Sequence, residues 1–310
     1  MDLRSLRYFA EIAETESFSR AAARLRRSQP ALSRCMQELE RELGVRLFQP
    51  RGRGIALTSN GRALIGPIQR LLSEAEAIAG HARLLGTGKT SILRVGVSAN
   101  MIESVLPAVL KRYRARWPNV EIVLKTEGGS ALLTALERGE VDIALTRHAQ
   151  SEFLASRPAF PVYILAALPR GHRLSRQQSL SILDLASERL LVAPPSVTSR
   201  RLFESACQSS QVRPRVALET HELNALVALA EADQGIAVIP STVDTSGRSV
   251  TALPIFHDGK PLASWMALVW GLHREQPDYA KGFVRLACES LGKVYPGREL
   301  GLPIPNPQPL

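Results

Sequence analysis

The feature that most constrains this chain is a repeated order of strand and helix patterns beyond residue 91. Short β-branched runs alternate there with amphipathic segments, which is typical of parallel α/β architecture. The order strand, helix, strand, helix, strand occurs over residues 92–146 and again over residues 190–239. The first two strands begin 28 residues apart in one unit and 26 in the other, and the next two begin 21 and 20 apart. The repetition predicts two similar α/β lobes.

Two further apolar, β-prone segments, residues 162–168 and 265–270, lie where the chain must pass from one lobe to the other. We predict that they are the crossovers between the lobes. A closing helix at residues 277–290 would return to the first lobe. The alternating prolines at residues 303–309 predict an extended, mobile tail.

The first 60 residues have a different pattern, with apolar residues at helical spacing in three successive segments. Ser17 and Ser19 both offer N-caps for the second segment. The third is the most clearly marked, because Ser28 is a natural N-cap and Pro30 sits in the first turn, where its missing N–H costs nothing. Gly44 ends this segment. We therefore predict three helices.

Polar side chains point away from the apolar stripe of the third helix. Glutamine can bond adenine, arginine can bond guanine or phosphate, and serine can bond either, so this face suits a helix that reads DNA. A solvated polar face on a small helical bundle is the alternative. The candidate DNA contacts on this helix are Ser28, Gln29, Pro30, Ser33, Arg34 and Gln37.

Two short apolar segments, residues 45–48 and 55–57, flank the basic turn Arg51-Gly52-Arg53-Gly54. This spacing predicts a hairpin, the wing of a winged helix-turn-helix. Arg51 and Arg53 at its tip are candidates to enter a minor groove or to hold phosphates. The alternative is a solvated hairpin turn.

A set of residues in register runs through the whole head. They are Ser17-Phe18-Ser19-Arg20-Ala21-Ala22, Leu25, Ser28-Gln29-Pro30-Ala31-Leu32-Ser33, Leu39-Glu40, Leu43-Gly44-Val45, Leu47-Phe48, Leu57-Thr58 and Gly61. In these residues the head resembles the LysR-type transcriptional regulators, a resemblance that implies a winged helix-turn-helix and adds Thr58 to the candidate DNA contacts. The family usually carries arginine two residues after Phe48, where this chain has Pro50, which either removes a phosphate contact or moves it to Arg51.

After the head, apolar residues alternate at spacings of four and three, which is a heptad seam. A seam needs a partner, so we predict a linker helix over residues 61–86 that pairs with its copy in a second subunit, as the resemblance also implies. Gly66 and Pro67 predict a kink or a start delayed by a turn. Packing against the chain's own core is the alternative. The seam residues are Leu64, Ile68, Leu71, Ala75, Ile78, Ala82 and Leu85.

The two predicted lobes resemble the periplasmic-binding-protein-like effector domain of the same family, and residues 235–240 resemble its usual second-lobe strand. The chain departs from the family at Asp233, where glycine is common. In open parallel sheets, ligands sit beyond the carboxyl ends of strands, where helix N-termini present free N–H groups. Hydroxyls, glycines, an arginine and histidines meet there, which suits a small anion such as a carboxylate. Ordinary helix capping is the alternative for each residue. The candidate effector contacts are Ser98, Asn100, Gly129, Ser130, Thr146, Arg147, His148, Thr198, Ser199 and His221.

Composition narrows the class of protein without deciding it. The formal charge of +10 favours an anionic partner, although the head has eleven arginines and seven acidic residues and so carries only part of it. The three cysteines, Cys35, Cys207 and Cys288, are far apart in sequence and show no zinc spacing. No apolar run is long enough for a membrane span and no signal peptide pattern opens the chain, so we expect a cytoplasmic protein without a membrane partner.

We therefore expect a DNA-binding transcription regulator controlled by a small-molecule effector, with no catalytic residue, cofactor or metal. Its expected partners are double-stranded promoter DNA, the effector and a second copy of the chain, as a dimer or tetramer, with RNA polymerase as a further candidate. A solute-binding receptor would have no use for the head, and an enzyme of this fold would need a reactive cysteine or a paired acid and base. The expected divisions are a DNA-binding domain at 1–60, a linker helix at 61–86, a hinge at 87–91, an effector-binding domain at 92–295 with lobe I at 92–162 and 270–295 and lobe II at 163–269, and a proline-rich tail at 296–310.

Overall fold

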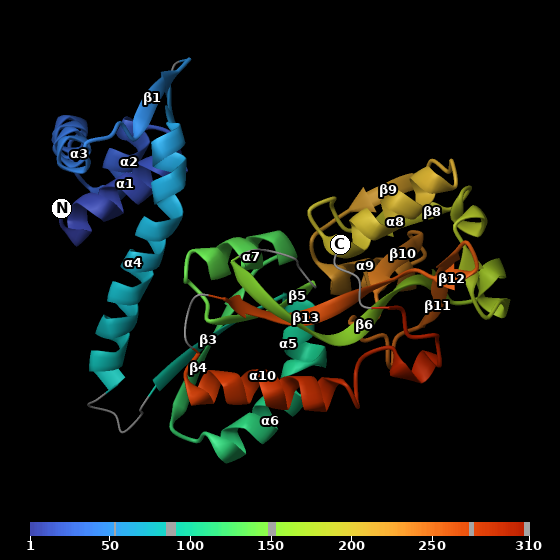
Figure 1. The fold of residues 1–310 in the computed structure, drawn as a ribbon. Coiled ribbons are helices and arrows are strands. Elements are labelled where there is room, and N and C mark those ends of the chain that lie inside the picture. The colour runs from blue at the N-terminus through green and yellow to red at the C-terminus, as the bar shows by residue number, and fades with distance from the viewer. Residues whose placement is uncertain (53, 85–90, 148–152, 273–275, 307–310) are drawn as a thin grey trace. The chain divides into compact units, whose positions relative to one another are not determined.

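The computed structural model describes residues 1–310 except 53, 85–90, 148–152, 273–275 and 307–310. The chain divides into two compact units, coloured along the chain in Figure 1. The first comprises residues 1–90 with 137–140, and the second comprises 91–136 and 141–310.

The first unit contains the three predicted helices, α1 (Leu3–Thr15), α2 (Phe18–Leu25) and α3 (Gln29–Leu43). The Asp2 carboxylate accepts the Ser5 N–H at 2.7 Å and so caps α1. Of the two serines that offered caps for α2, Ser17 caps it and Ser19 lies inside it. Gly44 ends α3 with φ +70°, a conformation that glycine adopts without strain.

The wing follows as β1 (Phe48–Arg51) and β2 (Gly54–Leu57), paired antiparallel from Phe48 opposite Leu57 to Arg51 opposite Gly54. Apolar side chains from the three helices, the wing and its preceding segment, and the helix that follows the wing form one core. Its buried members are Leu6, Phe9, Ile12, Ala21, Ala22, Leu32, Met36, Leu39, Leu47, Ile68 and Leu72.

Helix α4 (Ser59–Leu84) continues from the wing for 26 residues. It begins at Ser59, so the prediction that Gly66 and Pro67 delay its start is wrong. Proline is accommodated within the helix, where it removes one backbone hydrogen bond.

The predicted seam residues of α4 differ in their exposure to solvent. Ile68, 8% exposed, packs with the half-buried Leu64 into the core of its own unit, the alternative raised above for this helix. Further along, Leu71 is 47% exposed and Ile78 66% exposed, and both have apolar surface free for a partner. Ala82 is exposed as well, whereas Leu85 and most of the expected hinge lie outside the described residues.

In the second unit, lobe I is built on β3 (Ser91–Val97), β4 (Val120–Thr126) and β5 (Ile143–Arg147), which run parallel in the order β4-β3-β5. Its helices are α5 (Ala99–Ser104), α6 (Leu106–Arg116), α7 (Gly129–Glu137) and α10 (Asp278–Leu291). The repeated pattern predicted a single helix between the first two strands of this lobe, but the chain breaks there at Val105 into α5 and α6.

Lobe II repeats the pattern with β8 (Arg189–Val192), β9 (Arg215–Glu219) and β10 (Ile236–Pro240), and with α8 (Thr198–Ser209) and α9 (Leu223–Glu231). Strand β8 pairs parallel with both of its neighbours. The elements that sequence analysis missed are β7 (Leu180–Ser181), β11 (Val250–His257), β12 (Lys260–Pro261) and the 3-10 helices η1 (Arg173–Arg176), η2 (Leu183–Leu185) and η3 (Arg298–Leu300).

Two long antiparallel strands join the lobes, as Figure 1 shows. They are β6 (Leu154–Pro169) and β13 (Ala263–Gly271), and they contain both predicted crossovers. Strand β13 also pairs with β5 of lobe I, while β6 pairs with β10 of lobe II. The main path of the sheet is therefore β4-β3-β5-β13-β6-β10-β8-β9, with the crossovers at its centre, and β11 pairs with β6, β7 and β12 off this path.

The prediction of a mobile tail is wrong for its first part. Leu300 and Leu302 pack against the core of lobe II, and backbone carbonyls as far as Pro305 accept hydrogen bonds from the domain. Residues 307–310 lie outside the described part of the chain.

Candidate functional site

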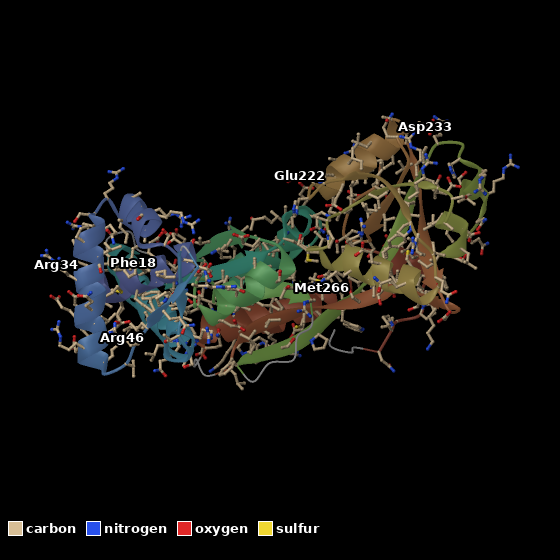
Figure 2. The ribbon with its side chains drawn as sticks, turned by 90° about the horizontal axis from the view of Figure 1, so that it is seen from above. Phe18, Arg34, Arg46, Glu222, Asp233 and Met266 are labelled. Atoms are coloured by element: carbon tan, nitrogen blue, oxygen red, sulfur yellow. The ribbon has the colours of Figure 1, made fainter. Side chains whose placement is uncertain are left out.

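The polar face of α3 lies outward in the structure. Leu32, Met36 and Leu39 are buried beneath it, while Gln29, Pro30, Arg34 and Gln37 are exposed and Ser33 is half-buried. Figure 2 shows Arg34 on the outer side of this helix. The predicted side chains are thus brought together on one accessible surface.

Ser28 and Thr58 differ in what their hydroxyls do. Ser28 occupies the N-cap position of α3, but its side chain makes no capping hydrogen bond, so its exposed hydroxyl remains available to another partner. The Thr58 hydroxyl accepts the Gly61 N–H at 3.0 Å and donates to the Arg46 carbonyl at 2.7 Å. Thr58 therefore holds the start of α4 against the segment before the wing.

A largely buried carboxylate ties α3 to the wing. Glu40, whose side chain is 11% exposed, accepts the backbone N–H groups of Leu47 at 2.7 Å and Phe48 at 3.3 Å. It also pairs with Arg46 at 3.2 Å. The wing tip carries the exposed Arg51, and Arg53 lies outside the described residues.

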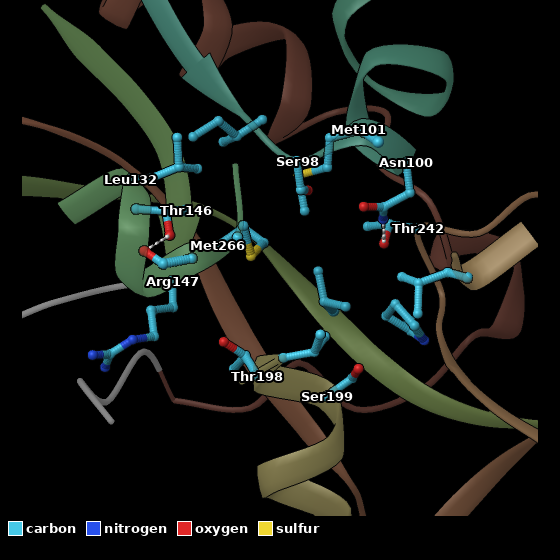
Figure 3. Close-up of a pocket in the computed structure, with 18 of the residues that line it drawn as sticks. Ser98, Asn100, Met101, Leu132, Thr146, Arg147, Thr198, Ser199, Thr242 and Met266 are labelled. Carbon is cyan, nitrogen blue, oxygen red and sulfur yellow. Dashed lines mark hydrogen bonds between the residues drawn. The ribbon is translucent and has the colours of Figure 1, made fainter. Parts of the chain in front are cut away.

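In the second unit, a cavity of about 310 Å³ lies between the two lobes. Figure 3 shows Ser98 and Asn100 reaching it from the side opposite Thr198 and Ser199, with Thr146 and Leu132 between. Most of its wall is apolar. The apolar side chains are Ala99, Met101, Leu132, Leu145, Val162, Ile164, Val197, Leu223, Pro240 and Met266.

Two hydrogen bonds cross the cavity between the lobes. The Asn100 amide donates to the Thr242 hydroxyl at 2.5 Å, as the dashed line in Figure 3 marks. The Asn224 amide of α9 donates to the Glu103 carboxylate of α5 at 3.1 Å. These bonds hold α5 close to lobe II around the cavity.

The N-terminus of α8 lies at the cavity, where the environment of the Ser199 hydroxyl is unusual. Ser199 is only 7% exposed, and its hydroxyl has no hydrogen-bond partner among the described residues. Val197 at the N-cap position offers no side-chain acceptor for the first N–H groups of the helix. The next residue, Arg200, donates to the Ala193 carbonyl at 3.3 Å and pairs with Glu204 at 2.6 Å, so it fixes this turn of α8 to the end of β8.

Charged groups at the cavity are of both signs. Burial, and to a lesser extent the nearby positive charge of Arg201, lowers the pKa of the Arg147 guanidinium. Figure 3 shows this side chain extending away from the centre of the cavity. The remaining charged lining residues are Glu103, Glu127 and Glu222.

Most of the predicted effector contacts meet at this cavity. Those that line it are Ser98, Asn100, Gly129, Thr146, Arg147, Thr198, Ser199 and His221. Ser130 lies on α7 away from the lining, and His148 lies outside the described residues. Thr242, Ser264 and Met266 also line the cavity and were not predicted. Thr242 follows β10 as Ser98 follows β3, so the same strand-end argument would have found it.

Within the described part of the chain, no cluster of three or more His, Cys, Asp or Glu side chains is arranged to hold a metal ion. None of the described helices has both the length and the apolar character that crossing a membrane requires.

Comparison with known proteins decides the family. Residues 3–62 match the model of the bacterial regulatory helix-turn-helix protein, lysR family, and residues 86–291 match the LysR substrate binding domain. The chain belongs to the LysR family of transcriptional regulators. The matched ranges place the outward face of α3 in the helix-turn-helix and the cavity in the substrate binding domain.

Individual relatives agree with the family models. The LysR-family chain is 31% identical to the HTH-type transcriptional regulator XapR of Escherichia coli (strain K12), over 77% of this chain and 82% of that protein. Among solved structures, a full-length OxyR variant from Pseudomonas aeruginosa has a TM-score of 0.65 at 22% identity and covers 100% of this chain and 99% of its own. Full-length CbnR complexed with target DNA has a TM-score of 0.61 at 22% identity, covering 94% of this chain and 100% of its own.

This LysR-family chain is therefore a DNA-binding transcription regulator with an effector-binding domain, and the two-lobed α/β fold expected for that domain is confirmed. Its relatives are regulators rather than enzymes.

Proposed function

We propose that this regulator responds to a small organic anion bound between the lobes, with its negative group at the N-terminus of α8. The observation that carries the proposal is the buried Ser199 hydroxyl, which has no partner among the described residues. A buried hydroxyl without a partner costs about 1–3 kcal/mol. An anionic oxygen that accepts from Ser199 would remove this cost.

The start of α8 suits such a group for a second reason. The first N–H groups of a helix have no acceptor within it, and the helix dipole gives this end a partial positive charge. Val197 supplies no capping oxygen, so these N–H groups are available to a ligand. Thr198 adds a second hydroxyl from the same turn at the cavity.

The size and lining of the cavity describe the rest of the ligand. Its volume of about 310 Å³ is near the small end of the range for ligand sites. The wall is mostly apolar, with Met101 and Leu132 on one side and Met266 near the centre. These properties favour an anion with a compact apolar body, such as an aromatic or branched carboxylate.

For the DNA-binding head, we propose that α3 enters the major groove and that Gln29, Arg34 and Gln37 contact base edges. We propose that Arg51 in the wing holds phosphate. The exposed apolar residues of α4, Leu71 and Ile78, support self-association, so that two heads bind half-sites about one helical turn apart in a promoter. Such a regulator works in the cytoplasm.

The effector is tested by isothermal titration of the whole protein with benzoate, 3-methylbutanoate and succinate, each beside its uncharged amide. We expect at least one acid, and none of the amides, to bind. Ser199→Ala should weaken that binding by about 10-fold or more, because a hydrogen bond to a charged group is lost. The matched control is Ser209→Ala, an exposed serine at the far end of the same helix. Equal affinity in the Ser199 and Ser209 variants would refute the placement of the anion.

The DNA site is tested by selecting genomic fragments in about 0.15 M salt, where a specific protein prefers its site by about a thousandfold or more. We expect a few pseudo-palindromic fragments, and we expect Arg34→Ala to lose this enrichment. Arg4→Ala, which removes an exposed arginine from α1, is the control for the change in charge. Undiminished selectivity in the Arg34 variant would remove α3 from sequence reading.

A further inference from the structure

The chain after α10 does not leave the domain. Residues 295–306, here called the strap, run from the end of lobe I toward lobe II and contact the crossover strands. Figure 1 shows this red segment turning back toward β6 and β13 before the chain ends. Its course is unexpected for a proline-rich terminal segment, since such segments are commonly unattached.

Three side chains of the domain anchor the strap by hydrogen bonds to its backbone carbonyls. The Ser241 hydroxyl donates to Pro296 O at 3.1 Å. The phenol of Tyr163, which is 1% exposed, lies 3.3 Å from Pro303 O. The indole N–H of Trp265 donates to Pro305 O at 2.8 Å. The anchors are thus spread along the whole strap.

Each anchor lies between two residues that line the effector cavity. Val162 and Ile164 flank Tyr163 on β6, and both line the cavity. The same holds for Ser264 and Met266 around Trp265, and for Pro240 and Thr242 around Ser241. Tyr163 and Trp265 lie within β6 and β13, where successive side chains point to opposite faces, and Ser241 directly follows β10. The strap therefore binds the reverse face of the strands that form the cavity floor.

The strap also packs closely. Gly297 has φ +92°, and a Cβ added there would lie 2.9 Å from the Ser241 Cβ and Oγ atoms. Leu300 and Leu302 pack against a buried cluster that includes Tyr163 and Ile239. Any residue larger than glycine at position 297 would lift the strap from Ser241.

We propose that the strap is a positioning element of the effector pocket, and that Tyr163, Trp265 and Ser241 transmit its attachment to the cavity floor. Detaching the strap frees the strands at residues 162–164 and 264–266 and so weakens ligand binding. The expected loss of ligand binding rests on the proposed effector site, whereas the expected freeing of the strands does not depend on it.

The test uses a matched pair of strap variants, Gly297→Ala and Gly301→Ala. Both glycines have positive φ, but a Cβ at Gly301 meets nothing within 4 Å, so only Gly297→Ala should lift the strap. A second pair is Trp265→Phe, which removes the indole donor, and Trp270→Phe, whose ring packs on the lobe I core. If Gly297→Ala does not fold, the comparison of Trp265→Phe with Trp270→Phe still tests the proposal.

The first readout is hydrogen–deuterium exchange of peptides that contain residues 162–164 and 264–266, with no ligand present. We expect about fivefold faster exchange in Gly297→Ala and Trp265→Phe, the effect of losing one hydrogen bond, and little change in the two controls. Acceleration confined to the strap itself, or equal in both glycine variants, would overturn the proposal.

The second readout is the emission of Trp265 in a protein that carries Trp117→Phe and Trp270→Phe, titrated with benzoate. Trp265 lies on the reverse face, so a change in its emission on binding reports coupling through β13. We expect that change in the parent and its loss with Gly297→Ala. Binding of benzoate without any change in Trp265 emission would overturn the coupling. If no acid binds the unaltered protein, the proposed effector site fails, and the exchange experiment still decides the role of the strap.

Discussion

The contact between Glu40 and the wing gives a prediction whose magnitude follows from the structure. Replacing Glu40 by alanine leaves the N–H groups of Leu47 and Phe48 without their acceptor in a part-buried position. An unsatisfied buried donor costs about 1–3 kcal/mol, and partial access to water places each of these near the lower limit. We therefore expect the first unit to lose about 2 kcal/mol, or about a 30-fold change in its folded-to-unfolded ratio.

Glu40→Gln should lose less, because the amide oxygen can still accept one of the two N–H groups. The order of stability is then wild type, glutamine, alanine. Glu38→Ala, an exposed glutamate on the same helix, is the control and should stay near wild type. Because Glu40 also sets the position of the wing relative to α3, DNA affinity should fall in the same order.

The two units can be followed separately, since Trp117, Trp265 and Trp270 all lie in the second unit and the first has none. Urea unfolding is measured by tryptophan fluorescence and by helical circular dichroism. We expect Glu40→Ala to shift part of the dichroism transition to lower urea and to leave the fluorescence transition in place. An unchanged dichroism curve, or equal losses in Glu38→Ala and Glu40→Ala, would refute the reasoning.

Three more predictions test the packing and the caps. Gly282→Ala should destabilise the second unit by about 1–3 kcal/mol and shift the fluorescence of Trp117, because the new Cβ would lie 2.1 Å from the Trp117 ring; an unshifted urea midpoint would contradict this. Burial raises the pKa of Tyr163 to about 12. The neutral phenol therefore stabilises the fold fully below pH 10, the pKa of the unfolded chain. This contribution, at most about 3 kcal/mol, is lost as the pH rises from 10 to 12. Unfolding measured across that window should depend less on pH in Tyr163→Phe, and equal slopes would count against the assignment. Ser17→Ala should cost about 1 kcal/mol through loss of its cap on α2, whereas Ser28→Ala should cost far less because Ser28 makes no cap bond; equal losses in thermal unfolding would show that the two serines do not differ.

The head was predictable from sequence because its signals are local. Apolar spacing, the Ser17 cap and the terminal Gly44 mark the helices within a few residues of their ends. The clamp by Glu40 was not predicted, since it joins residues seven and eight positions apart through a wing whose position no local pattern encodes.

The full length of strand β6 could not be predicted from its sequence. Pro158 and Pro161 lie inside it, and proline in a sequence argues against a central strand because it cannot donate to the ladder. The structure accommodates Pro158 beside an irregularity in the pairing with β13, between Met266 and Ala267. Bulges are a known place for proline within a sheet, but a bulge depends on the partner strand and leaves no signal in the sequence of β6 alone.

The effector cavity contains some residues that the sequence predicts and some that it does not. Ser98, Thr146 and Thr198 could be predicted, because parallel strands bring their carboxyl ends to one edge whatever the details of packing. Ser264 and Met266 could not be predicted, because they reach the cavity from within a crossover strand. These residues become part of the site only through the antiparallel pairing of β6 with β13.

That pairing also determines what a ligand can change. A ligand shifts a conformational equilibrium only by the difference between its affinities for the two states. Because β6 and β13 both line the cavity and join the lobes, a ligand that contacts Val162, Ile164 or Met266 would act directly on the strands that connect the lobes. The irregular pairing at Met266 and Ala267 interrupts the ladder beside the cavity. The strap holds the opposite face of the same strands through Tyr163 and Trp265, so ligand and strap act on one shared element from its two sides.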